Sequence, residues 1–195
     1  MPSPISLLIL LSVLMLGCTQ DGMKVAPEQL KEETTGNDTI PLYRLGDWGT
    51  IEQFVKANEG KVVVIDIWST YCAPCMKEFP RLVALQKNHG DKIACASFNI
   101  NYAGLPDQTP ETDIEFIEPF LEKHGNSVDH IISTITDEKI YAMLDIYAIP
   151  AVLIYNSQGI LTDKILDENA YESTVYPRIS EMLGNPTPSG ESDDT

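Results

Sequence analysis

The segment Val62–Trp68 constrains the fold more than any other part of the chain. It is a continuous apolar run, mostly β-branched, broken only by Asp66. Such a run is typical of a central strand buried on both faces, whereas a half-exposed strand alternates apolar and polar residues. A Cys-x-x-Cys pair, Cys72 and Cys75, follows shortly afterwards, and the segment from Ala73 to Asn88 has a helical pattern that ends at Gly90. The sequence therefore predicts a buried strand that leads directly into a helix, with two cysteines at the junction.

The rest of the chain alternates between strand and helix patterns, which predicts an α/β sandwich. Thr50 and Gln53 have the spacing of a capping box at the start of a short helix, Pro80 predicts a kink, and Pro177 predicts an interruption of the last helix. The other expected elements are a strand at Ile93–Ile100, a loop at Asn101–Thr112, a helix at Asp113–His124, a strand at Val128–Ile132, a helix at Asp137–Leu144, a hairpin of Ala151–Tyr155 with Gly159–Leu166, and a helix at Asn169–Leu183.

The charge of the chain excludes several classes of partner. Of the 195 residues, 29 are acidic and 13 are basic, which gives a formal net charge of -16. Nucleic-acid binding draws its energy from lysine and arginine on phosphates, and docking to anionic lipid needs a polybasic segment, so neither is expected here. A hydrophobic content of 43% indicates one packed domain.

The N-terminus predicts export. Residues 1–17 contain an apolar run that is too short to span a bilayer but suits a signal peptide. Gly17-Cys18 then resembles the end of a bacterial lipoprotein signal, which implies acylation of Cys18 and attachment to a membrane through this lipid; an ordinary cleaved signal is the alternative. Residues 18–40 are expected to form a tether, residues 41–184 the folded domain, and residues 185–195 a disordered acidic tail. These features predict a location in the cell envelope or periplasm.

The position of the cysteine pair favours redox chemistry. Cys72 lies at the expected N-terminus of a helix, where unpaired N–H groups and the macrodipole stabilise a thiolate. Cys75, one turn later, can resolve a mixed disulfide formed at Cys72. The alternatives are an inert disulfide or half of a zinc site, but the remaining candidate ligands show no paired spacing: Cys95, His89, His124 and His130. We therefore expect no metal and no cofactor beyond the Cys72–Cys75 pair itself.

These residues together resemble the thioredoxin family over roughly Thr50 to Leu183. Asp66 stands where thioredoxins carry a buried acid that moves the proton of the second cysteine, and Trp68 and Pro80 match their tryptophan and their helix-kinking proline. Ile149-Pro150 matches their cis-proline, which faces the disulfide. The resemblance implies a thioredoxin fold, with a central mixed β-sheet sandwiched by α-helices. It also implies that substrate binds in extended form, and the residues expected to bind it are Trp68, Tyr71, Ile149 and Pro150.

A narrower resemblance is to the TlpA/ResA group, membrane-tethered thiol-disulfide oxidoreductases of bacterial envelopes. It rests on the segment Cys75-Met76-Lys77-Glu78-Phe79-Pro80, on an inserted strand and helix at about Asn101 to Asp137, and on the N-terminal anchor. It implies that Glu78 is a second proton-relay acid and that the chain takes part in cytochrome c maturation. The sequence departs from the expected patterns at Tyr71, Asp66, Ala151 and Ser97, and Ser97 occupies the place of a lysine that pairs with the buried acid in thioredoxins.

The ionisable residues also have simpler interpretations. A carboxylate in an apolar strand is costly unless it is protonated or partnered, so burial should raise the pKa of Asp66 and suit it to a proton relay. Glu78 is alternatively a solvated helix residue. Cys95 is expected in the core, and the three histidines at the surface.

The expected reaction is disulfide exchange with another protein. Cys72 attacks the substrate disulfide, and Cys75 resolves the intermediate with help from Asp66. The Ala73-Pro74 pair lacks the histidine of oxidising and isomerising variants, which favours a reductase supplied with electrons by a membrane thiol donor. A disulfide isomerase or oxidase and a non-catalytic binding module remain as alternatives.

Overall fold

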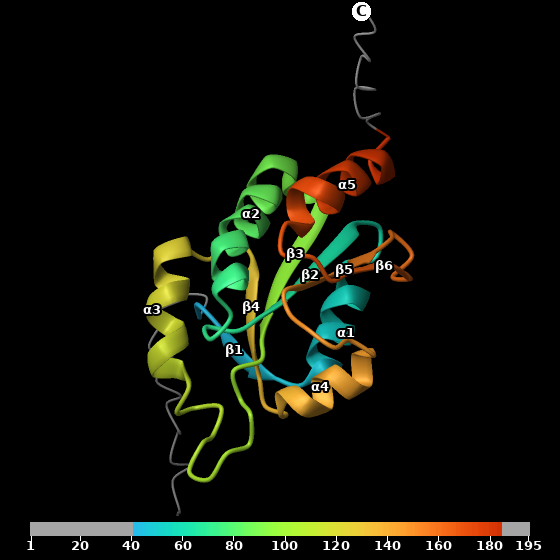
Figure 1. The fold of residues 1–195 in the computed structure, drawn as a ribbon. Coiled ribbons are helices and arrows are strands. Elements are labelled where there is room, and N and C mark those ends of the chain that lie inside the picture. The colour runs from blue at the N-terminus through green and yellow to red at the C-terminus, as the bar shows by residue number, and fades with distance from the viewer. Residues whose placement is uncertain (1–40, 185–195) are drawn as a thin grey trace, which may run out of the picture. The chain divides into compact units, whose positions relative to one another are not determined.

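The computed structural model describes residues 41–184, which form a six-stranded sheet in the order β1-β4-β3-β2-β5-β6. The strands β1, β4, β3 and β2 are parallel, β5 is antiparallel to β2, and β6 is antiparallel to β5. The strands are β1 Arg44–Gly46, β2 Val62–Trp68, β3 Ile93–Asn99, β4 Asp129–Ser133, β5 Ala151–Tyr155 and β6 Leu161–Ile165. The predicted mixed sheet is confirmed (Figure 1).

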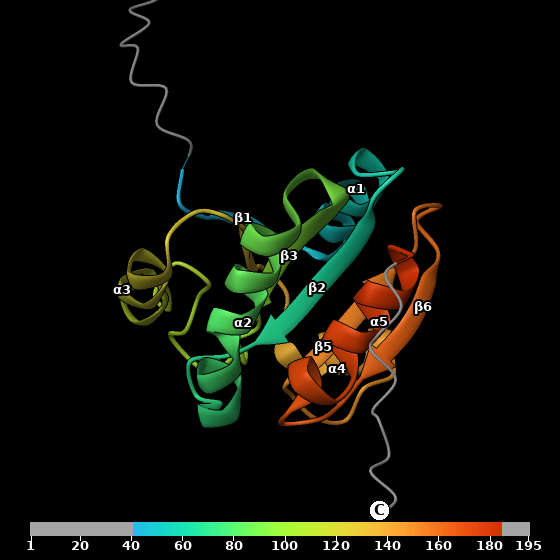
Figure 2. The same ribbon diagram turned by 90° about the horizontal axis from the view of Figure 1, so that it is seen from above.

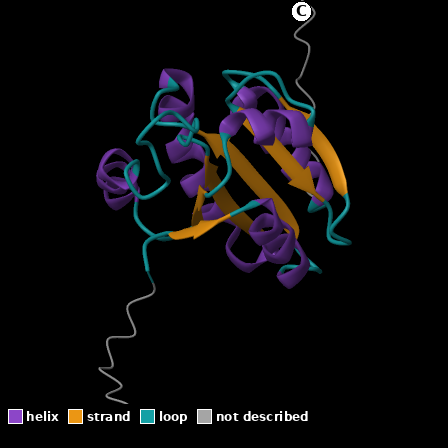
Figure 3. Ribbon diagram, turned by 90° about the horizontal axis from the view of Figure 1, so that it is seen from below, coloured by secondary structure: helices purple, strands orange, loops and turns teal. Residues whose placement is uncertain are grey.

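Helices cover both faces of this sheet (Figures 2 and 3). They are α1 Trp48–Ala57, α2 Ala73–His89, α3 Ile114–His124, α4 Asp137–Leu144 and α5 Tyr176–Met182, with a 3-10 turn at Gly90–Lys92 and a π-helical turn at Tyr171–Val175. One core cluster joins the sheet to α2, α3, the π-helical turn and α5, and the other joins the opposite face to α1 and α4. The predicted α/β sandwich is therefore present.

Strand β2 occupies the centre, as its composition predicts, and all seven of its residues are buried. Val63, Ile65 and Ile67 pack on the side of α1 and α4. Because side chains alternate along a strand, Asp66 is directed to the other face, beneath α2. This alternation places the only carboxylate of β2 behind the cysteine pair.

The segment between β3 and α4 adds α3 and β4, and β4 is hydrogen-bonded between β1 and β3. The predicted insertion thus contributes a strand to the interior of the sheet. Strand β1 was not expected, because its three residues carry no β-branched signal.

Two helix starts differ from their predictions. The capping box at Thr50 and Gln53 is wrong: α1 begins at Trp48, and Asp47 is the N-cap, whose side chain accepts a hydrogen bond from Thr50 N–H at 3.2 Å. The last helix is split as Pro177 suggested. Proline has no N–H to continue the regular ladder, and just before it Tyr176 N–H donates to the carbonyl of Tyr171 in the π-helical turn.

The predictions for residues 1–17, Cys18, residues 18–40 and residues 185–195 lie outside the described residues. Within residues 41–184, no helix is long and apolar enough to cross a membrane.

Candidate active site

Cys72 and Cys75 form a disulfide at the N-terminus of α2, with an S–S distance of 2.03 Å. Cys72 is the N-cap residue, and its Sγ accepts a hydrogen bond from Cys75 N–H at 3.2 Å. Cys72 is half-buried, whereas Cys75 is buried. A substrate sulfur can therefore reach Cys72, while Cys75 is shielded behind it.

The loop that carries Cys72 is fixed by Asn101, a residue that the sequence did not single out. Asn101 Oδ1 accepts hydrogen bonds from Ser69 Oγ and from Thr70 N–H, each at 2.9 Å. Its Nδ2 donates to Thr70 Oγ1 at 2.7 Å. Ser69 Oγ in turn accepts from Tyr71 N–H at 3.1 Å, so the amide side chain orders the residues that precede Cys72.

A hollow of about 420 Å³ opens beside Cys72. Its lining includes Tyr71, Leu105, Tyr141 and Ile149. The Ile149-Pro150 peptide bond is cis, Pro150 is buried, and Tyr71 is 69% exposed. The disulfide thus lies next to a surface that offers apolar contacts to an approaching chain.

Trp68 does not belong to this surface. It is fully buried, and its ring centroid lies 4.8 Å from that of Phe79 and 5.0 Å from that of Phe120. The prediction that Trp68 binds substrate is wrong in so far as it requires contact, because β2 directs this side chain into the core. Trp68 supports the site from beneath.

Asp66 is 2% exposed, and its Oδ2 accepts a hydrogen bond from Tyr171 Oη at 2.6 Å. Burial is the main reason that the pKa of Asp66 rises to about 7. The hydrogen bond from Tyr171 lowers the pKa, and the charge of Glu78 raises it. The expected upward direction is present, and the carboxyl is balanced between its two protonation states near neutral pH.

Glu78 is also 2% exposed, so the interpretation as a solvated helix residue is wrong. Its Oε2 lies 3.1 Å from Arg81 Nε. That separation fits an ion pair, but the atoms do not meet the geometry of a hydrogen bond. Arg81 also pairs with Glu172, so a single cation serves two carboxylates.

His130 corrects the expectation that all three histidines lie at the surface, because it is 1% exposed. Its Nδ1 lies 2.8 Å from Ser97 Oγ, and its Nε2 lies 3.0 Å from the carbonyl oxygen of Gly125. The ring also stacks on Phe79. Both nitrogens are satisfied by neighbours, which makes burial tolerable. His89 and His124 are half-buried.

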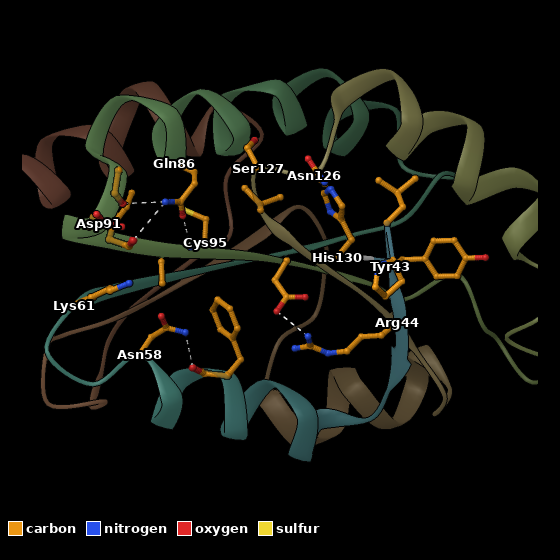
Figure 4. A pocket seen from close by; sticks show the side chains of 18 residues that line it. Tyr43, Arg44, Asn58, Lys61, Gln86, Asp91, Cys95, Asn126, Ser127 and His130 are labelled. Carbon is orange, nitrogen blue, oxygen red and sulfur yellow. Dashed lines mark hydrogen bonds and ion pairs between the residues drawn. The ribbon is translucent and has the colours of Figure 1, made fainter. Parts of the chain in front are cut away.

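Cys95 is buried as expected, and its burial raises the pKa of its thiol well above the ordinary value. It lines a second hollow, of about 450 Å³, at the start of β3 (Figure 4). Gln86 Oε1 accepts a hydrogen bond from Cys95 N–H at 2.7 Å there. This hollow is larger than the one beside Cys72, but it contains neither cysteine of the pair. Within the described part of the chain, no group of three His, Cys, Asp or Glu side chains could hold a metal.

A mixed sheet with a Cys-x-x-Cys disulfide at a helix N-terminus and a neighbouring cis-proline defines a thiol-disulfide oxidoreductase of the thioredoxin fold. Solved structures agree with this fold. A putative thiol:disulfide interchange protein DsbE from Chlorobium tepidum is 16% identical, with a TM-score of 0.54 over 67% of this chain and 85% of that one. A thioredoxin-like superfamily protein is 18% identical, with a TM-score of 0.53 over 69% of this chain and 87% of that one.

The chain belongs to the thioredoxin family. Thioredoxin of Alicyclobacillus acidocaldarius is 31% identical over 101 residues, which cover 49% of this chain and 90% of that protein. The thiol-disulfide oxidoreductase ResA of Bacillus subtilis is 20% identical over 147 residues, or 75% of each chain. The thioredoxin-like protein YneN of Bacillus subtilis is 27% identical over 106 residues, which cover 54% of this chain and only 56% of that protein. No family model matches the chain.

Proposed function

We propose that this chain reduces disulfide bonds of other proteins in the cell envelope. The observation that carries the proposal is the unequal burial of the cysteine pair: Cys72 is half-buried and lines the hollow, while Cys75 and Asp66 are buried and do not line it. Disulfide exchange by a cysteine pair requires an accessible nucleophile that attacks the substrate and a shielded thiol that then resolves the mixed disulfide.

The reaction starts from the reduced pair. The thiolate of Cys72, stabilised at the N-terminus of α2, attacks one sulfur of the substrate disulfide and releases the other as a thiolate. Cys75 then gives its proton to the carboxylate of Asp66 and attacks Cys72 Sγ. The Cys72–Cys75 disulfide forms, the second substrate sulfur leaves, and two electrons have passed to the substrate.

The surface around Cys72 has the features that an extended substrate needs. Tyr71 offers a large exposed ring, and Ile149 lines the same hollow as Cys72. Backbone groups at Ile149-Pro150 are the proposed partners of the substrate main chain. This arrangement favours unfolded or loosely folded protein segments over compact ones.

Glu78 is the proposed second acid of the proton route. It is buried and close enough to Asp66 for its charge to raise the pKa of Asp66, and its carboxylate is paired with Arg81, whose side chain is partly exposed. The alternative role is purely structural, as the partner of Arg81. Glu78→Gln removes the charge that raises the pKa of Asp66, so the pH midpoint of the resolving step should fall in either case. A relay acid also sets the rate, so loss of a relay slows the resolving step above that midpoint, whereas loss of a structural partner leaves that rate unchanged.

We propose three further properties from the sequence: the direction of electron flow, the source of the electrons and the location of the protein. Ala73-Pro74 between the cysteines favours a reductant, supplied by a membrane thiol donor, and the likeness to the TlpA/ResA group suggests substrates in cytochrome c maturation. Residues 1–17 would direct export, and acylation of Cys18 would hold the domain at the membrane through the tether of residues 18–40. Hydrophobic partition of the mature protein that survives Cys18→Ser would refute the acylation.

Trapping with Cys75→Ser tests the function. This variant should accumulate partners as mixed disulfides on Cys72, and Cys72→Ser/Cys75→Ser should accumulate none. Cys95→Ala is the control for the remaining cysteine of the described domain, because Cys95 is buried and lines a different hollow, and it should behave as the wild type. A reduction potential above about -150 mV, closer to the strong oxidant DsbA than to thioredoxin, would replace the reductase by an oxidase or isomerase. If Cys75→Ser accumulates no mixed disulfides, the chain acts as a binding module without turnover and the proposed reductase function is refuted.

A further inference from the structure

Tyr171 connects the C-terminal end of the domain to the carboxyl group behind the disulfide. It is 1% exposed, and its Oη donates to Asp66 Oδ2 at 2.6 Å, although 105 positions separate the two residues. Within residues 41–184, Tyr171 is the one side chain that donates a hydrogen bond to the carboxylate of Asp66. No motif of the sequence pointed to Tyr171.

The other groups around Asp66 supply no positive charge. In the register of the sheet, Ser97 of β3 and Val152 of β5 lie beside Asp66, and the Ser97 hydroxyl is bonded to His130 instead. The ionisable groups that act on Asp66 or feel its charge are Glu78 from α2, Cys95 from β3 and Tyr171 from the π-helical turn. Within residues 41–184, no lysine or arginine forms an ion pair with Asp66. The partner of the buried carboxyl is therefore the neutral hydroxyl of Tyr171 and not a cation.

We propose that Tyr171 is the positioning residue of the buried acid: its hydroxyl occupies Asp66 Oδ2, so that Oδ1 receives the proton of the Cys75 thiol. The inference rests on the proposed disulfide exchange and names the group that controls its resolving step. In this role Tyr171 acts through Asp66 and not directly on the substrate or the sulfur atoms.

A tyrosine suits this task because it remains a donor throughout the working pH range. Its burial and the neighbouring charge of Asp66 raise the pKa of Tyr171 well above its ordinary value of 10.0. A cation within a few ångströms would lower the pKa of a carboxyl by about one to three pH units. A hydrogen bond from a neutral hydroxyl lowers the pKa less than a cation does. The effect of burial therefore still holds the pKa of Asp66 at about 7, and the carboxylate remains basic enough to accept a thiol proton.

The π-helical turn fixes the direction of the tyrosine side chain. The neighbouring residue, Glu172, is ion-paired with Arg81 on α2, while Tyr171 reaches inward to β2. Tyr176 N–H donates to the carbonyl of Tyr171, and the two rings lie 5.9 Å apart. The widened turn is thus held on two sides, by α2 and by the buried carboxyl, which is consistent with the frequent use of π-turns at functional sites.

The test is a stopped-flow reaction of the reduced, mature protein with the disulfide reagent 5,5′-dithiobis(2-nitrobenzoate) over a range of pH. Each thionitrobenzoate released absorbs light: the first reports attack by Cys72, and the second reports resolution by Cys75. In Tyr171→Phe, loss of the donor should raise the pH midpoint of the second phase by about one unit, which makes that phase about tenfold slower below the midpoint. The first phase should keep the wild-type profile, as should both phases of the control Tyr155→Phe, which removes the hydroxyl of a half-buried tyrosine on β5.

Two comparisons separate the inference from the function on which it rests. A wild type that releases only the first thionitrobenzoate would refute the exchange function, whereas an unchanged second-phase midpoint in Tyr171→Phe would refute only the role of Tyr171. Asp66→Asn and Asp66→Asn/Tyr171→Phe should have coincident profiles, and a shift between them would show that Tyr171 acts through another group. If Tyr171→Phe does not fold, carbon-13 NMR of the wild type decides: the Asp66 carboxyl should titrate near pH 7 while Tyr171 Cζ keeps the chemical shift of a neutral phenol, and a phenolate shift of Tyr171 Cζ in this range would overturn the proposal.

Discussion

Ser97 Oγ donates a hydrogen bond to His130 Nδ1 at 2.8 Å on the face of the sheet beneath α2. The direction follows from the other ring nitrogen: Nε2 faces the carbonyl of Gly125, which can only accept, so Nε2 carries the hydrogen and Nδ1 is the acceptor. Asp66, Ser97 and His130 lie side by side in register across β2, β3 and β4. The Ser97 hydroxyl is thus bonded to His130 on the inserted strand β4, and Asp66 on β2 accepts its side-chain hydrogen bond from Tyr171.

Ser97→Ala should destabilise the protein by about 1–3 kcal/mol, because it leaves the buried Nδ1 of His130 without a donor. Urea unfolding near pH 7.5 measures the free energy of unfolding. Ser157→Ala, at an exposed position of the β5–β6 hairpin, is the matched control and should change it by less than about 0.5 kcal/mol. Equal effects of the two substitutions would show that the Ser97–His130 bond contributes nothing measurable.

Asp66→Asn should make the oxidised protein more stable at pH 8, and the gain should disappear toward pH 4. In the folded protein the carboxyl keeps its proton up to a pKa of about 7, whereas in the unfolded chain it loses the proton near the ordinary value of 3.8. The unfolded state therefore binds fewer protons between these values, and stability falls as the pH rises through them. At about 1.4 kcal/mol per pH unit, the full difference is roughly 4 kcal/mol.

Unfolding curves of the wild type and Asp66→Asn at several pH values measure this difference, and other titrating groups cancel in the comparison. The asparagine carbonyl can still accept the hydrogen bond from Tyr171, so the substitution removes the charge and keeps the contact. A difference that stays constant between pH 4 and pH 8 would contradict the raised pKa of Asp66.

The sequence predicted best those features whose burial follows from the composition of a single segment. The apolar run of β2 required a central strand, and the cysteine pair that follows had to lie at the start of α2. Asp66 could be recognised for the same reason, because a carboxylate in that run has to be buried. Its pKa direction followed from burial alone.

The partners of these groups could not be predicted, because they are set by long-range packing. Tyr171 reaches Asp66 from a π-helical turn that exists only in the folded last helix, and Asn101 reaches the Cys72 loop from the end of β3. The burial of His130 depends on Ser97 and the carbonyl of Gly125, which satisfy its ring only after β4 has joined the sheet. Local patterns contain no signal for such pairs.

Tyr71→Ala should weaken the reduction of a protein disulfide more than that of a small one. The ring is 69% exposed beside Cys72, so its contact area is available to a chain that passes over the hollow. With insulin as the protein substrate, KM should rise several-fold, while the first phase with 5,5′-dithiobis(2-nitrobenzoate) should change far less. Phe116→Ala removes an exposed ring of similar size on α3 and should leave both reactions unchanged. Equal losses for insulin and the small reagent would mean that Tyr71 affects the disulfide itself, not substrate binding.

Asn101→Ala should slow the attack of Cys72 as well as destabilise the fold. The amide accepts from Ser69 Oγ and Thr70 N–H and donates to Thr70 Oγ1, so its loss frees the loop that positions the nucleophile. We expect a loss of about 2–3 kcal/mol in the free energy of unfolding and a several-fold slower first phase with 5,5′-dithiobis(2-nitrobenzoate). Asn156→Ala is the matched control, because Asn156 Oδ1 accepts from Gln158 N–H and Ile160 N–H in the β5–β6 hairpin. It should lose stability and keep the wild-type rate. If both substitutions slow the first phase in proportion to their loss of stability, Asn101 supports the fold in general and does not position Cys72.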